Sequence, residues 1–259
     1  MTDDQSYSPG DEELARLQED SRAVLQYAGV KLDDIRRMDL NELMQLVIEK
    51  PMLSKVVVFE LGRRPRKPDP VAGETLIRAY REGRAHGWLT ALFLSVGAEG
   101  GYEVAREILL DAPLLQAESH ATSTMVAFDR NRACSDLLEI ICDDKAHARS
   151  RRYACEALRG LNDDRIAPRI VDAVRGGRLG QARAQAVLRG QPLTMEQLTS
   201  WLDATDDPMT NVAFDVACLR LERLGPALAQ TMRAALLAGR IDISQTEREK
   251  IEERIAKLL

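Results

Sequence analysis

Residues 151–170 read RRYACEALRGLNDDRIAPRI, and this stretch decides the expected fold. Its motif Ala154–Gly160 (ACEALRG) returns 30 residues later as Ala184–Gly190 (AQAVLRG). Asp215–Arg220 (DVACLR) follows at an offset of 31, and Thr124–Asp129 (TMVAFD) is a weaker copy 30 residues before the first. This period fits two helices of roughly 12 residues each with their turns. A single hairpin of this kind cannot bury its own apolar face, so neighbouring hairpins are expected to stack on it.

The pattern resembles the HEAT-like repeat family, in the short bacterial form related to the phycobilisome-lyase repeats. The positions that carry the resemblance are Arg151, Arg152, Ala154, Ala157, Leu158, Leu161, Asp164 and Pro168. The resemblance is strongest over residues 144–190 and extends over 118–225. It implies an all-α fold, a right-handed α-α superhelix of the HEAT-like or ARM-like solenoid type. Asp163 or Asp164 is expected to cap the next helix, which tolerates Pro168 in its first turn.

Glycine and proline divide the rest of the chain. The predicted organisation is a disordered tail at 1–10, an N-terminal helical cap at 11–62, a Pro- and Arg-rich hinge at 63–70, a HEAT-like solenoid at 71–240 and a C-terminal capping helix at 241–259. Three prolines in the hinge exclude a regular helix interior. The two flanking regions are expected to cover the apolar ends of the solenoid.

Local signals refine this outline. Asp39 or Asn41 is placed to cap a helix that ends near Pro51, and 244–247 (SQTE) has the form of a capping box. Residues 56–61 (VVVFEL) are rich in β-branched residues, but an isolated strand would have no partner, so they are expected to form a buried helix. Residues 97–101 (GAEGG) lack the Lys-Ser/Thr of a phosphate loop and are interpreted as a turn.

Composition excludes several classes of protein. The 259 residues are 45% hydrophobic, 30% charged and 4% aromatic, which is typical of a globular, helix-rich chain. The formal charge of −5 excludes a polycation built to coat nucleic acid. The acidic residues 1–20 do not resemble a secretory signal, and the apolar run 89–96 is far shorter than the roughly 18 residues that span a bilayer. We therefore expect a soluble, cytoplasmic protein that does not associate with membranes.

The sequence carries no recognisable catalytic or metal-binding motif. The cysteines lack a CxxC pair and are interpreted as buried free thiols: Cys134, Cys142, Cys155 and Cys218. The three histidines are far apart, so no metal site and no cofactor are expected. Iron-dependent hydroxylases with this repeat carry His-Glu pairs, which are absent here. HEAT-like DNA glycosylases use groove tryptophans, whereas Trp88 and Trp201 both lie in apolar surroundings typical of core residues.

The arginines are the candidate binding residues. Residues 144–189 contain ten arginines and one lysine against five acidic residues. Arg159, Arg189 and Arg220 occupy aligned repeat positions, which predicts a ladder along one side of the solenoid. Arg152 and Arg183 are predicted to project from neighbouring turns. A structural alternative is that such arginines pack their stems over the seams between repeats and pair with acidic neighbours.

The function expected from these features is a non-enzymatic scaffold or adaptor. Its concave face is expected to bind a protein partner that carries an acidic patch. One alternative is a lyase or chaperone-type protein that holds a small ligand in the groove. A weaker alternative is nucleic-acid binding through 144–189, which the acidic flanking segments disfavour because they would repel a long polyanion.

Overall fold

The computed structural model describes residues 22–64, 69–84, 90–111 and 117–259. All regular secondary structure in these ranges is helical, which confirms the all-α class. The chain divides into two compact units, of which the first ends at Phe128 and the second begins at Asp129. The predicted tail at 1–10, prolines 65 and 68 of the hinge, and Trp88 lie outside the described residues.

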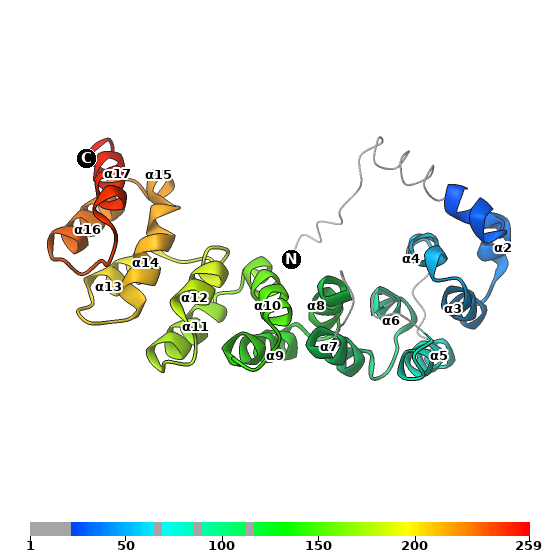
Figure 1. Ribbon diagram of the computed structural model, residues 1–259. Coiled ribbons are helices and arrows are strands. Elements are labelled where there is room, and N and C mark those ends of the chain that lie inside the picture. The colour runs from blue at the N-terminus through cyan, green and yellow to red at the C-terminus, as the bar shows by residue number, and fades with distance from the viewer. Residues whose placement is uncertain (1–21, 65–68, 85–89, 112–116) are drawn as a thin grey trace. The chain divides into compact units, whose positions relative to one another are not determined.

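In the first unit, residues 22–28 are helical and the chain turns at Gly29. The elements that follow are α2 (Leu32–Arg37), α3 (Leu40–Glu49), the 3-10 helix η1 (Pro51–Leu53), α4 (Ser54–Gly62), α5 (Pro70–Arg81), α6 (Thr90–Val96), α7 (Gly101–Asp111) and α8 (Ala117–Phe128). Helix α3 packs against α5 and α5 against α7, while α4 packs against α6 and α6 against α8 (Figure 1). Each of these helices therefore contacts the helix two positions further along the chain.

Several local predictions in this unit are confirmed. Asp39 begins α3 with a capping box, since its side chain accepts from the Glu42 N–H and the Glu42 carboxylate accepts from the Asp39 N–H, both at 2.8 Å. The β-branched run 56–61 lies inside α4, where Val56 and Val57 are buried. Residues 97–100 form the turn between α6 and α7, with Gly97 and Gly100 at positive φ.

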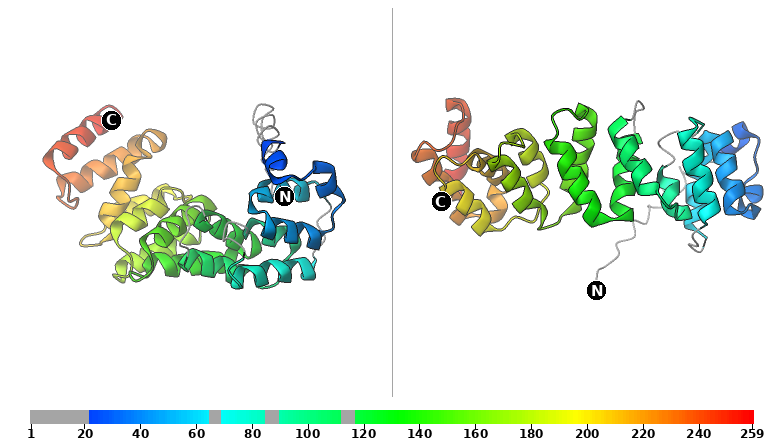
Figure 2. Two further views of the ribbon diagram at one scale, coloured as in Figure 1. Left: turned by 45° about the vertical axis from the view of Figure 1, so that its right-hand side comes forward. Right: turned by 90° about the horizontal axis from the view of Figure 1, so that it is seen from below.

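The second unit continues the helical pattern. Its elements are α9 (Arg130–Cys142), α10 (Ala148–Leu161), α11 (Ile166–Arg175), α12 (Gln181–Leu188), α13 (Met195–Asp203), α14 (Met209–Cys218), the short α15 (Leu221–Leu224), α16 (Pro226–Leu237) and α17 (Gln245–Ala256). Helix α10 packs against α12 and α12 against α14, and all three lie side by side in Figure 1 and Figure 2. Helix α9 packs against α10 and α11, and α13 packs against α14 and α16.

The repeated apolar positions form the core of the second unit. Ala154 and Leu158 of α10 are completely buried, and so are Ala184 and Leu188 at the same positions of α12. The small side chains of Ala154 and Ala184 allow α10 and α12 to approach closely. Trp201 is also buried, as predicted for a core residue.

Helix α17 begins at the predicted capping box. The Ser244 side chain accepts from the Glu247 N–H, and the Glu247 carboxylate accepts from the Ser244 N–H. Ile255 is the buried residue of this helix, which packs against α16. The amphipathic pattern at the end of the sequence therefore forms a docked helix.

Candidate functional site

Arginine side chains throughout the described helices donate to the last carbonyl groups of other helices. Arg64 Nη1 lies 2.7 Å from the Met38 carbonyl oxygen after α2, and Arg254 Nη2 lies 3.0 Å from that of Cys218 at the end of α14. A cation at a helix C-terminus interacts favourably with the helix dipole and satisfies carbonyls that have no partner within the helix. Four further contacts of this type join Arg130 to Leu161, Arg183 to Ile141, Arg240 to Leu202 and Arg248 to Leu236.

Two of the predicted binding residues are engaged within the protein. Arg183 reaches from α12 to the end of α9, where its Nη2 also pairs with the Asp144 carboxylate at 2.6 Å. This contact holds the pKa of Asp144 below its ordinary value. Arg152 is exposed on α10, pairs with Glu156 at 3.3 Å and lies over the ring of Tyr153. Arg183 thus fits the structural alternative, and Arg152 forms a surface contact within its own helix.

Arg159 lies against the turn that follows α12. A Cβ atom on Gly190 would overlap the Arg159 carbonyl oxygen and come within 2.6 Å of Arg159 Cγ. Only glycine therefore allows this turn to sit directly on the end of α10. The Arg159 guanidinium is exposed, and none of the described acidic side chains forms an ion pair with it.

Arg220 is placed differently from the arginines with which it aligns in sequence. Arg189 follows the last residue of α12, Leu188, and is exposed. The matching helix α14 ends at Cys218, so the structural offset between the helix ends is 30 residues rather than 31. Leu219 takes the exposed position and is 57% exposed, whereas Arg220 turns inward and is only 9% exposed. The expected ladder of three equivalent arginines does not describe this position.

The buried guanidinium of Arg220 joins α15 to the turn after α12. Its Nη2 donates to the carbonyl oxygens of Gln191 at 2.7 Å, Leu188 at 3.1 Å and Arg189 at 3.3 Å. Its Nη1 is buried and has no hydrogen-bond partner. Burial, with a contribution from the nearby Arg223, lowers the pKa of Arg220. A buried donor without a partner costs about 1–3 kcal/mol, so this atom needs an explanation.

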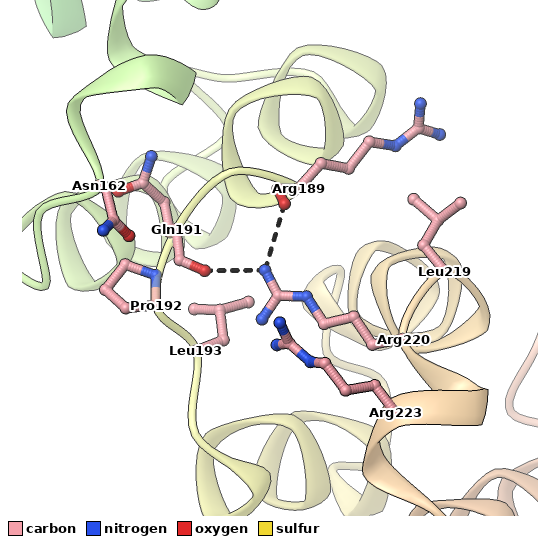
Figure 3. A pocket seen from close by; sticks show the side chains of 8 residues that line it. All are labelled: Asn162, Arg189, Gln191, Pro192, Leu193, Leu219, Arg220 and Arg223. Atoms are coloured by element: carbon pink, nitrogen blue, oxygen red, sulfur yellow. Dashed lines mark hydrogen bonds between the residues drawn. The ribbon is translucent and has the colours of Figure 1, made fainter.

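An open pocket of about 610 Å³ surrounds this guanidinium. Three arginines line it and no acidic residue does; the full lining is Asn162, Arg189, Gln191, Pro192, Leu193, Leu219, Arg220 and Arg223. Figure 3 shows the Arg223 guanidinium beside that of Arg220, whereas the Arg189 side chain is directed away from both. The nearest charge to Arg220 in the pocket is therefore another positive charge, which creates a strong local preference for an anion.

The wall of the pocket is held by a buried amide. Gln191 is 2% exposed, donates from Nε2 to the Leu158 carbonyl at 2.8 Å, and accepts at Oε1 from the Asp163 N–H at 3.1 Å. The Asp163 carboxylate accepts from Arg165 Nη2 at 2.6 Å and also accepts from the Arg165 N–H just before α11. The prediction that Asp163 or Asp164 caps this helix is wrong, because the N-cap position of α11 is Arg165 and no side chain caps it. Asp163 instead closes a turn just before the helix, and its charge is directed to Arg165 rather than to the pocket.

The described thiols have the properties of structural cysteines. Cys134 and Cys155 are buried, Cys142 and Cys218 are half-buried, and all four are free. Burial raises the pKa of each thiol, to about 11 for Cys155 and about 12 for Cys218. A thiol in this state is a poor nucleophile because the reactive form is the thiolate.

The arginine cluster is defined as Arg159, Arg189, Arg220 and Arg223. Three of its members were predicted from the sequence, and the structure brings them around the 189–193 turn. Arg223 was missed, although its spacing of three residues from Arg220 places both on one side of a helical turn. The contribution of Gln191 was also missed, because a Gly-Gln-Pro sequence indicates only a break between helices.

Other sources of functional information are negative. Among the residues that the structure describes, no three His, Cys, Asp or Glu side chains gather to hold a metal ion. No helix within those ranges combines the length and apolar character needed to cross a membrane. Comparison of the chain with known protein families, curated proteins and solved structures found no match. The arginine cluster is therefore the feature from which a function can be inferred.

Proposed function

We propose that this protein is a HEAT-like helical-repeat scaffold, with a right-handed α-α superhelix, whose exposed arginines bind an acidic patch on a protein partner. The architectural part rests on the period of 30–31 residues and on the packing of most helices within each unit against the helix two positions along, as in α4 against α6 and α10 against α12. The residue pattern of 151–170 supports the same family. Stacked hairpins of this kind provide an extended surface whose residues can vary without changing the core.

The binding part rests on one observation, the unpaired positive charge around the 189–193 turn. Arg159, Arg189 and Arg223 are all exposed, and no acidic side chain in the described ranges forms an ion pair with any of them. Leu219, with 57% exposure, adds an apolar contact beside them. Exposed arginines next to an exposed leucine have the composition of a binding surface, in which arginine is enriched and supplies much of the binding energy.

The test is affinity capture from native lysate with charge-reversed variants. The site variant is Arg159→Glu/Arg189→Glu/Arg223→Glu, and the matched control reverses three exposed arginines elsewhere, Arg78, Arg81 and Arg233. We expect one acidic protein to be captured by the wild type and the control, and lost by a site variant with an unchanged thermal melt. The captured protein is then purified and its affinity measured at two salt concentrations. Retention by the folded site variant would contradict the proposal.

Nucleic-acid binding through 144–189 is less well supported by the observed contacts. At least five of the ten arginines in this block form ion pairs within the protein, namely Arg151, Arg152, Arg165, Arg175 and Arg183. Because these arginines are already paired with carboxylates, the block has fewer free cations to contact a phosphate backbone. The salt dependence of binding to a mixed-sequence duplex DNA tests this alternative directly.

A further inference from the structure

One donor atom in the arginine cluster, Nη1 of Arg220, has no acceptor within the protein. The Arg220 side chain is more than nine-tenths buried, and three main-chain carbonyls fix its Nη2. Its Nη1 is buried and has no hydrogen-bond acceptor, and Arg220 is one of the residues that line the pocket. The carbonyls hold the guanidinium in one orientation, so Nη1 is a preorganised donor.

The second donor is Arg223. Its guanidinium lies beside that of Arg220 in Figure 3, and its exposed side chain can turn to admit a group between the two. Two guanidinium groups placed together without a carboxylate repel each other, and this repulsion is relieved when an anion bridges them. The nearest acidic residue in sequence, Glu222, is already paired with Arg254 at 2.6 Å.

We infer that Arg220 and Arg223 form a binding site for a doubly charged tetrahedral oxyanion, as presented by inorganic phosphate or a phosphate monoester. A dianion neutralises both guanidinium groups, whereas a single carboxylate neutralises one. Arginine forks match phosphate oxygens in geometry and form the stronger, charge-assisted hydrogen bonds. Leu193, Pro192 and Leu219 add apolar side chains to a lining that is otherwise polar, and these can contact the organic part of a monoester.

This inference does not require a protein partner. A small phosphate compound would occupy the same pocket in the isolated protein, so its binding can succeed where capture of an acidic protein fails. Conversely, an acidic protein can bind the exposed Arg159 and Arg189 without any use of Arg220 Nη1. The failure of one proposal is therefore distinguishable from the failure of the other.

The experiment is a titration of the full-length protein at constant ionic strength, followed by calorimetry and by ¹⁵N NMR of the arginine Nε–Hε groups. The probes are inorganic phosphate, O-phosphoserine, sulfate and acetate. Sodium chloride is added so that the ionic strength is the same for every probe, because salt screens the attraction between charges, with a screening length of about 8 Å at physiological salt. We expect phosphate and sulfate to shift the Arg220 and Arg223 signals and acetate to bind at least about tenfold more weakly. Tighter binding of O-phosphoserine than phosphate would identify a monoester as the better ligand, and equal binding would identify the free ion.

The variants are chosen so that a folding defect cannot imitate loss of binding. Arg223→Gln removes an exposed side chain that makes no carbonyl contact, and we expect it to weaken phosphate binding about tenfold with an unchanged melting temperature. Arg233→Gln on α16 is the control and should bind like the wild type. Arg220→Lys retains the charge but loses the fork. Absence of phosphate binding, equal affinity for acetate, or wild-type affinity in Arg223→Gln would each overturn the inference.

Discussion

Arg220 Nη2 lies 2.7 Å from the main-chain oxygen of Gln191, and this contact ties the segment after α14 to the turn after α12. The two residues belong to neighbouring helical pairs, so a side chain of one pair completes the end of the other. Gln191 in turn donates to Leu158 at 2.8 Å, which extends the same connection to α10. Three successive pairs of the second unit are thus joined by polar contacts along one edge.

Removal of the Arg220 guanidinium should destabilise the second unit. We expect Arg220→Met to lower the free energy of unfolding by about 2 kcal/mol, because hydrogen bonds from a charged donor to the carbonyls of Leu188, Arg189 and Gln191 are lost. Arg223→Met is the control and should stay within about 0.5 kcal/mol of the wild type. Urea unfolding followed by circular dichroism measures both. Equal stability of Arg220→Met and the wild type would show that these bonds contribute no net stabilisation.

Gly190 and Gly160 provide a matched pair at aligned repeat positions. We expect Gly190→Ala to destabilise the protein by about 2 kcal/mol, since its methyl group would meet the main chain and Cγ of Arg159. Gly160 lies inside α10 with open space around its Cα, so Gly160→Ala should stabilise by about 0.5–1 kcal/mol. Thermal melts of the two variants should therefore shift in opposite directions. A destabilised Gly160→Ala would contradict the packing described for α10.

Asp163 should make part of the stability depend on pH. The hydrogen bond from Arg165, together with the charge of Arg130, holds the pKa of Asp163 well below its ordinary value. A carboxyl group whose pKa is lower in the folded state adds stability above its unfolded pKa of about 3.9, and this stability is lost as the pH falls through the folded pKa. We expect the urea midpoint of the wild type to fall more between pH 6.5 and pH 3 than that of Asp163→Asn.

Asp172→Asn serves as the comparison for that experiment. Asp172 is an exposed aspartate on α11 that is not among the ion pairs of the described residues. Its replacement should leave the pH dependence of the wild type unchanged. An identical pH dependence in Asp163→Asn and Asp172→Asn would assign the acid sensitivity to other carboxyl groups.

The thiols should react slowly while the protein is folded. Burial raises the pKa of Cys155 to about 11 and, with a contribution from Asp215, that of Cys218 to about 12. At pH 8 the thiolate fraction of either group is more than about a hundredfold smaller than for a thiol of pKa 8.5. Alkylation by iodoacetamide, read for each cysteine by peptide mass spectrometry, should be slow in buffer and fast in urea. Rapid modification of either residue in the folded protein would indicate an activated thiol.

Local signals in the sequence determined most of the secondary structure. The capping residues Asp39 and Ser244 mark the starts of α3 and α17, since a side-chain acceptor at that position satisfies N–H groups that have no partner within the helix. The repeated Ala154 and Leu158 positions also predicted which faces are buried, because helical spacing places them on one side. The family resemblance and the division into cap, hinge and solenoid remain predictions.

Only the tertiary structure decided which arginines form a site. The sequence nominated Arg152, Arg159, Arg183, Arg189 and Arg220 by their alignment, but alignment does not determine what a long side chain reaches. Arg183 pairs with Asp144, which is 39 residues away in the sequence. Arg220 turns inward because α14 ends one residue before the position that the alignment implied. Burial and charge pairing depend on such long-range contacts. Local patterns specify helices and their apolar faces, and the packing of those helices determines which charges remain free.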